Sequence, residues 1–338
     1  MGRKEWAKPF WQYRVRRMLA ADLPNVVAMW RQWQPFPPVL ERMLPEVLEK
    51  LILQQFITGA MVERLRGPGM DWELAAFGFG SFMAPRLRER YLQEPFAFVA
   101  VDVLEHALAG RTEEVLLARQ EVDVLQKNSP PRLDYLVLTW LQDNFDFTDE
   151  DGRQLLLQGV RVLERYATGF RLRSLLLEGM VHNLLAFRLA GFSRVVDCSD
   201  MIPPQYAELR DDPRYRPFMH GMHELGQGMA DLPLNPIARL FHFTEPVLNL
   251  TDSQKEVLDL ALEGYSDQAI ARFLSIKPSA VQMRWRRIYE KALLVLPELA
   301  EVDERCADGR RGQEKRRMVV EYIREHPQEI RPWIVMPS

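Results

Sequence analysis

Residues 250–292 read LTDSQKEVLDLALEGYSDQAIARFLSIKPSAVQMRWRRIYEKA, and they predict three short helices separated by two tight turns. Apolar residues crowd positions 257–262, which indicates a helix with one buried face. Thr251 and Gln254 have the spacing of a capping box at its start. Gly264 ends it, because glycine readily adopts the left-handed conformation that follows many helices.

The second and third helices have start signals of their own. Ser266 is a capping residue for the second helix. Residues 275–277 form the turn, and Pro278 suits the first position of the third helix, where its missing N–H costs nothing. The apolar residues of the third helix recur at helical spacing and form one stripe: Val281, Trp285, Ile288 and Ala292.

The opposite side of the third helix is polar and cationic. Between residues 277 and 291 five Lys or Arg residues stand against one carboxylate, Glu290. A helix with a buried stripe and such an outer face suits the major groove of DNA. The side chains expected on this face are Ser279, Gln282, Met283, Arg286 and Arg287.

These residues resemble the LuxR/GerE-type helix-turn-helix of bacterial transcription regulators, over about an eighth of the chain and without a gap. The matching residues are Leu250, Thr251, Glu256, Val257, Leu258, Glu263, Gly264, Ser266, Ile270, Ala271, Leu274, Ile276, Pro278, Ser279, Val281, Arg286, Arg287, Ile288, Tyr289 and Lys291. The resemblance implies a transcription regulator that binds double-stranded DNA as a homodimer.

The same resemblance assigns roles to individual side chains. Arg286 and Gln282 are expected to read bases, Met283 to touch a thymine methyl group, and Ser279 to lie beside them. The residues expected to hold phosphates are Lys277, Arg284, Arg287 and Lys291, together with Ser266 and Gln268. The family usually has other residues at Lys277, Ala280, Gln282, Arg284 and Ala292, so we expect an uncommon operator sequence. The alternative interpretation is a three-helix module that binds protein, its arginines merely solvated.

Composition bounds the remaining function classes. The chain has 338 residues, 47% hydrophobic and 27% charged, with a net charge of −3. Residues 249–338 contain fifteen Lys or Arg and fifteen Asp or Glu, so DNA binding must depend on a local patch. Two cysteines, Cys198 and Cys306, indicate a reducing compartment. Neither a signal peptide nor an apolar run of membrane-spanning length is evident, so we expect a cytoplasmic protein without a membrane partner.

Residues 1–200 predict an α/β or α+β domain with a central sheet, because strand-like and helix-like segments alternate. Asp22 is the expected cap of the first helix. The expected strands are 13–18, 74–82, 96–104, 133–141, 172–177 and 192–196. The first expected helix begins near residue 22, and the later ones cover 39–57, 153–166 and 180–189.

This order resembles the GNAT acyltransferase fold. The residues that carry the resemblance are Arg14, Val15, Arg16, Asp22, Leu23, Pro24, Ala186, Phe187, Gly191 and Phe192. It implies acetyl-CoA as cofactor, held by a glycine-rich turn, and a tyrosine as catalytic acid. Here the turn at residues 143–153 has one glycine and five carboxylates, which would repel a pyrophosphate, and Phe187 takes the place of the tyrosine.

We therefore interpret residues 1–200 as a sensor for a small-molecule or protein effector. In this interpretation the domain keeps an acyltransferase-like fold without the transferase site. No cofactor is assigned to it, and the candidate ligand is an acyl-CoA-like molecule. The alternatives are a GNAT-type acyltransferase with an accessory helix-turn-helix, and an adaptor that binds protein through both domains. His220 and His223 suggest a metal site only if they share a helix, and neighbouring glycines make that a poor helix.

A proline-rich segment, residues 201–248, is expected to pack as a linker, with a short helix at 235–241. Residues 249–338 form the expected all-α helix-turn-helix domain, and a further helix at 313–325 extends it. In the resembled family, the helix after the reading helix often forms a dimer contact. The basic residues of the extension, Arg310, Arg311, Lys315, Arg316 and Arg317, suit either phosphate contacts or a solvated face.

Overall fold

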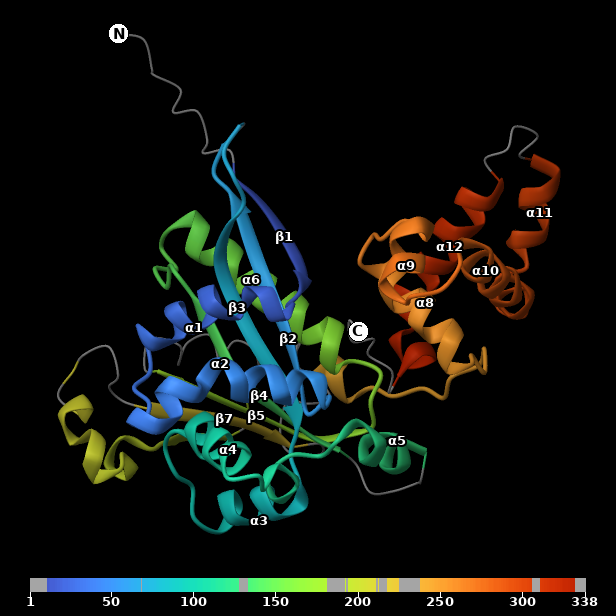
Figure 1. The fold of residues 1–338 in the computed structure, drawn as a ribbon. Coiled ribbons are helices and arrows are strands. Elements are labelled where there is room, and N and C mark those ends of the chain that lie inside the picture. The colour runs from blue at the N-terminus through green and yellow to red at the C-terminus, as the bar shows by residue number, and fades with distance from the viewer. Residues whose placement is uncertain are drawn as a thin grey trace, which may run out of the picture. The chain divides into compact units, whose positions relative to one another are not determined.

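The computed structural model describes residues 11–67, 69–127, 133–180, 192, 194–210, 212, 218–224, 238–305 and 311–331. The chain divides into two compact units (Figure 1). Unit 1 comprises residues 1–121, 133–167 and 172–238, and unit 2 comprises 122–132, 168–171 and 239–338. Unit 1 is an α/β unit with a mixed sheet, and the C-terminal part of unit 2 is helical, as the sequence predicted.

Unit 1 contains a seven-stranded sheet of order β1-β2-β3-β4-β5-β7-β6. Its strands are β1 Gln12–Arg17, β2 Ile57–Leu65, β3 Glu73–Phe82, β4 Leu133–Gln142, β5 Leu172–Met180, β6 Arg194–Asp197 and β7 Phe218–Glu224. Neighbouring strands are antiparallel, except that β4 and β5 run parallel. β7 belongs to the stretch expected as a linker, and it lies between β5 and β6.

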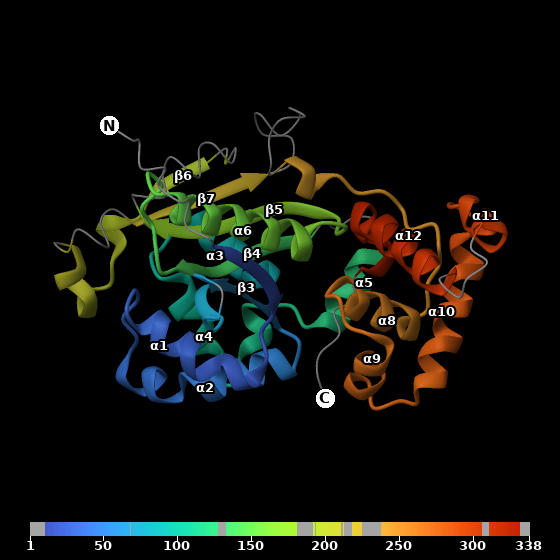
Figure 2. The same ribbon diagram turned by 90° about the horizontal axis from the view of Figure 1, so that it is seen from above.

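The helices of unit 1 cover both faces of the sheet (Figure 2). They are α1 Leu23–Arg31, α2 Pro38–Leu53, α3 Pro85–Gln93, α4 Val99–Leu108, α5 Arg119–Lys127 (whose last six residues belong to unit 2) and α6 Glu150–Ala167. Side chains alternate across a strand, so Ala76 packs with Leu155 of α6 while Phe77 and Phe79 contact Trp30 of α1. Trp30 is fully buried and anchors the core on the α1 face.

Some sequence-based expectations for unit 1 were wrong. Residues 96–104 are not a strand, because α4 begins after Phe98, whose φ of 63° is left-handed. A short, continuous apolar run has no periodicity that separates a buried strand from a buried helix. The second helix ends at Leu53 instead of near residue 57, because Ile57 begins β2. Strand β2 and helices α3 and α5 were not among the elements expected from the sequence.

Asp22 stands at the N-cap position of α1, but its carboxylate does not cap that helix. It accepts the backbone N–H of Leu19 at 2.8 Å and pairs with Arg16 at 2.7 Å. Burial alone would raise the pKa of Asp22, but these two partners hold it below its ordinary value. The expected helix at 180–189 and the acid position Phe187 lie outside the described residues, apart from Met180, which ends β5.

Unit 2 builds its core from helices around α10. Its helices are α8 Asp252–Leu262, α9 Asp267–Phe273, α10 Pro278–Ala292, α11 Glu298–Arg305 and α12 Arg311–Glu325, with short 3-10 turns at Ala238–Phe241 and Pro327–Ile330. α12 confirms the helix expected at 313–325, and its Val319 and Ile323 are buried in the same core as the α10 stripe. Among the described residues, none of the helices combines the length and apolar character needed to cross a bilayer.

Candidate nucleic-acid interface

Local signals in the sequence set the ends of α8 and α9. Gln254 Oε1 accepts the N–H of Thr251 at 2.9 Å, which is one half of the expected capping box. Gly264 has the expected left-handed φ of 86° and terminates α8. Ser266 Oγ accepts the N–H of Ala269 at 3.3 Å and caps α9.

The turn into α10 is equally compact. Ser275 takes a left-handed φ of 52°, and the N–H of Ile276 returns to the carbonyl of Ala271 at 2.9 Å. Pro278 is the first residue of α10, as expected. All four residues of the expected stripe are buried in the core of unit 2: Val281, Trp285, Ile288 and Ala292.

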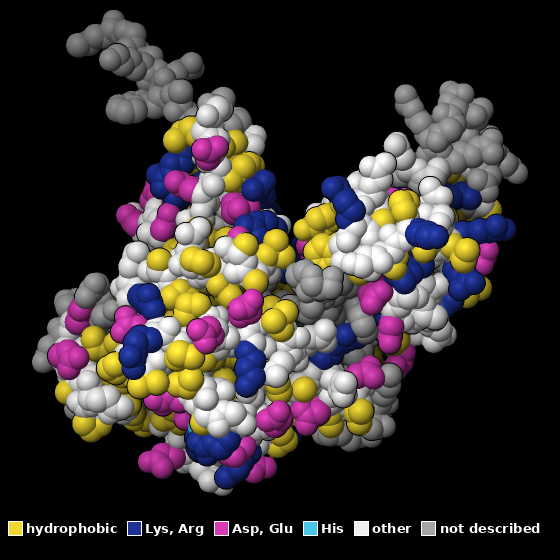
Figure 3. All heavy atoms as spheres, viewed as in Figure 1, with side chains coloured by type: hydrophobic (Ala, Val, Ile, Leu, Met, Phe, Trp, Pro, Cys, Tyr) yellow, Lys and Arg dark blue, Asp and Glu magenta, His cyan; other side chains and the backbone are white. Residues whose placement is uncertain are grey.

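The face opposite this stripe is exposed. The exposed residues of α10 and its preceding turn include Lys277, Ser279, Gln282, Met283, Arg286, Arg287 and Glu290. Ser266 and Gln268 of α9 are exposed as well. Figure 3 shows Lys and Arg side chains over the outer surface of this helical unit. We call this set of nine residues the α10 face.

Two of the expected phosphate contacts have partners within unit 2. Arg284 Nη1 lies 3.1 Å from the Glu256 carboxylate on α8, and both side chains are about three-quarters buried. Lys291 Nζ donates to the carbonyl oxygen of Asn249 and, at 3.1 Å, to Gln254 Oε1. Both cations therefore hold α10 against α8 and are less available to a ligand than the exposed arginines.

Arg286, by contrast, is held weakly. Its Nε lies 3.5 Å from Glu290 Oε1 one turn along the helix, and its side chain is 84% exposed. An exposed pair of this kind contributes less than about 1 kcal/mol. Arg286 can therefore leave Glu290 for a guanine edge or a phosphate at small cost.

A polar cluster beneath α10 was not foreseen from the sequence. Asp267 Oδ1 accepts the indole N–H of Trp285 at 3.1 Å and pairs with Arg316 of α12 at 2.5 Å. Arg316 also donates to the carbonyl of Tyr265 and lies over the Trp285 ring, 5.0 Å from its centroid. Arg316 is thus a structural residue that fixes α9, α10 and α12 together. The one sequence signal for this cluster is Asp267 itself, a carboxylate in the first turn of α9, where the helix dipole favours a negative charge.

Other charged residues of the extension are also paired. Arg317 bridges Glu314 and Glu321 at 2.6 and 2.8 Å.

Tyr289 stacks on Trp285, and burial raises the pKa of its hydroxyl to about 12 although Arg316 opposes the shift. Tyr289 is therefore a neutral hydrogen-bond donor at physiological pH, and its hydroxyl donates to the carbonyl of Gly312 at 3.3 Å.

The turn between β4 and α6 is where an acyltransferase-like site was considered. The backbone N–H groups of Asp146 and Thr148 donate, each at 2.9 Å, to the side chains of Asn144 and Asp146. Gly152 packs so closely that a Cβ there would lie 2.2 Å from the carbonyl oxygen of Asp146. The contacts of these two amides and of Gly152 are therefore made within the turn itself.

Two carboxylates of this turn and one from β3 converge on one buried arginine from β2. Arg64, 1% exposed, pairs with Asp143 and Asp151 at 2.5 Å each and with Glu73 at 2.8 Å. Tyr13 donates its hydroxyl to Asp151 at 2.6 Å. Arg64 therefore holds two of the turn's five carboxylates within unit 1, and no local sequence pattern indicates this network.

The histidine pair does not lie on a helix, because His220 and His223 belong to strand β7. Within the described parts of the chain, no group of three or more His, Cys, Asp or Glu residues is placed to share a metal ion. The amino-acid sequence matches no protein-family model and no curated protein. Any functional assignment must therefore come from the residues and their geometry.

Proposed function

We propose that the protein is a DNA-binding transcription regulator in which α8, α9 and α10 form a helix-turn-helix of the LuxR/GerE type. In this proposal α10 enters the major groove of double-stranded DNA, and unit 1 senses a small-molecule or protein effector. The observation that carries the proposal is the division of α10 into a buried stripe and an exposed polar, cationic face. A helix with its side chains is about 10–12 Å wide and the major groove about 12 Å, so the face has room to read bases.

The contacts within unit 2 refine the roles of the cations. Arg286 and Gln282 are exposed and are the proposed base readers, with Met283, 57% exposed, as an apolar contact. Lys277 and Arg287 are exposed and take the main phosphate contacts. Arg284 and Lys291 contribute to phosphate binding through their charge while they remain bound to α8 and the residues before it.

For unit 1 we propose a GNAT-like fold without transferase activity. The order β1, α1, an antiparallel β2-β3-β4 meander and then a parallel strand β5 reached through α6 supports the fold. The turn at residues 143–153 speaks against acetyl-CoA, since two of its amides donate to its own side chains and its carboxylates would repel a pyrophosphate. Calorimetry with acetyl-CoA tests this part: binding with turnover would favour the acyltransferase alternative.

The DNA-binding proposal is tested by selecting bound duplexes from random or genomic DNA with the full chain, at one stated salt concentration. Enrichment of a defined sequence supports a transcription regulator. A two-fold symmetric sequence additionally supports a homodimer, because operator symmetry mirrors protein symmetry. Recovery of unenriched DNA, or of none, contradicts the proposal.

A further inference from the structure

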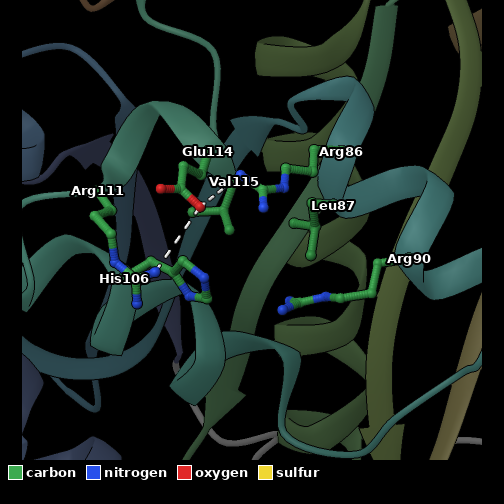
Figure 4. Close-up of a pocket in the computed structure, with 7 residues that line it drawn as sticks. All are labelled: Arg86, Leu87, Arg90, His106, Arg111, Glu114 and Val115. Carbon is green, nitrogen blue, oxygen red and sulfur yellow. Dashed lines mark hydrogen bonds and ion pairs between the residues drawn. The ribbon is translucent and has the colours of Figure 1, made fainter.

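A small pocket in unit 1 has three arginines among its seven lining residues (Figure 4). It lies between α3, α4 and the 3-10 turn Thr112–Glu114, and has a volume of about 160 Å³. Leu87 and Val115 are buried and form its apolar wall. The polar residues that line it are Arg86, Arg90, His106, Arg111 and Glu114.

The charges of the lining are unequal. Three guanidinium groups stand against Glu114, which lines the pocket, and Asp102, which pairs with Arg90, so one positive charge remains in excess even when the histidine is neutral. Figure 4 shows Arg86 and Arg90 extending from α3 toward the side of the pocket that carries His106, Arg111 and Glu114. An anion in the pocket would add a favourable partner for this excess positive charge.

Existing contacts position two of these groups. Arg90 pairs with Asp102 of α4 and lies over the Phe96 ring, 4.7 Å from its centroid. His106 Nδ1 donates to the carbonyl oxygen of Asp102 at 2.8 Å, because a carbonyl oxygen can only accept. This bond leaves Nε2 as the ring nitrogen that can contact a ligand.

Glu114 is the internal competitor for a ligand. It lies 2.8 Å from Arg86 Nη1 and 3.9 Å from Arg111 Nη1. The side chains of Arg86 and Arg111 are 75% and 55% exposed, so these pairs contribute little net free energy. A doubly charged anion can therefore replace Glu114 as the partner of both arginines.

We propose that this pocket binds a phosphate group. One arginine can satisfy the two oxygens of a planar carboxylate, whereas several arginines from different directions suit a tetrahedral oxyanion. The pocket is large enough for a phosphate group, since a cavity of about 150 Å³ holds a ligand the size of benzene. The pocket therefore takes inorganic phosphate or the phosphate group of a larger molecule that extends into solvent.

Isothermal titration calorimetry on the full chain tests the proposal, at constant ionic strength and without DNA. The ligands are inorganic phosphate, a sugar phosphate and succinate. Binding of inorganic phosphate identifies a free-phosphate site, and binding of the sugar phosphate alone or more tightly identifies a phosphorylated molecule. No binding of either phosphate at millimolar concentration, or equal binding of succinate, overturns the proposal.

Variants locate the binding. Arg86→Gln is expected to weaken phosphate binding about tenfold, and Glu114→Gln to strengthen it, because one removes a cation and the other a competing anion. Arg42→Gln, an exposed position on α2 that does not line the pocket, is the matched control and is expected to bind as the parent chain does. Circular dichroism confirms that each variant folds. Unchanged affinity in both pocket variants overturns the assignment. Because no DNA is present, the result is independent of the DNA-binding proposal.

Discussion

Two arginines of this protein illustrate how burial decides what a cation does. Arg64 is 1% exposed and is surrounded by three carboxylates, whereas Arg286 is 84% exposed with one weak partner. Desolvation makes a buried charge depend on its partners, so Arg64 is structural. Arg286 pays little to change partner, so it is suited to recognition.

Arg286 is expected to provide sequence discrimination. Arg286→Ala should lower affinity for the selected duplex by about 1–3 kcal/mol and relax the preference at one base pair, because a bidentate contact to guanine is lost. Competition binding with single-base variants of the duplex measures both effects. The control is Arg324→Ala, an exposed arginine of α12, which should bind as the parent chain does. An unchanged base preference in Arg286→Ala would show that Arg286 does not read bases.

Arg64 is expected to stabilise unit 1 in a pH-dependent way. Arg64→Met should lower the free energy of unfolding by about 3–5 kcal/mol at pH 7, because the buried carboxylates lose their counter-charge. Arg66→Met, at an exposed neighbour that also contacts Glu73, should cost less than about 1 kcal/mol. Urea unfolding measures both. Equal effects of the two substitutions would contradict the role of Arg64.

The pH dependence follows from the carboxylates of the network. Burial would raise the pKa of Asp151, but hydrogen bonds from Tyr13 and Arg64 hold it below its ordinary value. Its contribution is therefore present above about pH 4 and is lost as the pH falls through the folded-state pKa. Burial raises the pKa of Asp143 despite Arg64, which works in the opposite direction. The cost of Arg64→Met should accordingly shrink as the pH falls toward the lowered pKa of Asp151, where its carboxylate becomes protonated.

Among the structural elements, the helices of unit 2 begin at signals that local sequence contains, because each start residue and its partner lie within about four residues of each other. Thr251, Ser266 and Pro278 mark the starts of α8, α9 and α10, and the structure confirms each. Tertiary partners have no such signal: nothing in the sequence pairs Asp267 with Arg316, or Arg64 with Asp151. The exposed side of α10 itself was predictable from helical periodicity. The engagement of Arg284 and Lys291 was not, because it depends on how α10 packs.

Gly264 tests the geometry of the turn after α8. Gly264→Ala should destabilise unit 2 by about 1–2 kcal/mol, because a residue with a Cβ is strained at a φ of 86° although the surrounding space is open. Gly312→Ala in α12, also in open space and without a positive φ, should be neutral or stabilising by up to about 1 kcal/mol. Thermal unfolding compares the two. A neutral Gly264→Ala would contradict the turn geometry.

Glu329 ties the segment before α8 to the core of unit 2. Its buried carboxylate accepts the backbone N–H groups of Val247 and Leu248, each at 2.9 Å. Glu329→Ala should therefore lower the free energy of unfolding by about 1.5–3 kcal/mol, since two amides lose a charged acceptor. Glu325→Ala, at an exposed position of α12, should change it by less than about 0.5 kcal/mol. Chemical denaturation distinguishes them, and equal stabilities would contradict this role.

At the scale of the whole molecule, composition and pattern predicted an α/β unit and a helical C-terminal part, and both are present. The same pattern missed β2 and assigned residues 96–104 to a strand, because apolar runs buried on every side have no polar face to set their period. The residue pattern also could not predict the order of strands in the sheet, because β7 comes from a proline-rich stretch and pairs with β5, which is far away in sequence. Such pairings depend on long-range packing that local residues do not encode.

We propose that the α10 face binds double-stranded DNA through exposed cations. Fluorescence anisotropy of a labelled selected duplex over a range of salt concentrations measures this binding. We expect a linear fall of log K with log salt, with a slope that Arg287→Ala reduces by about one unit and Arg324→Ala leaves unchanged. Absence of binding at low salt, or equal slopes for the parent chain and Arg287→Ala, would contradict it.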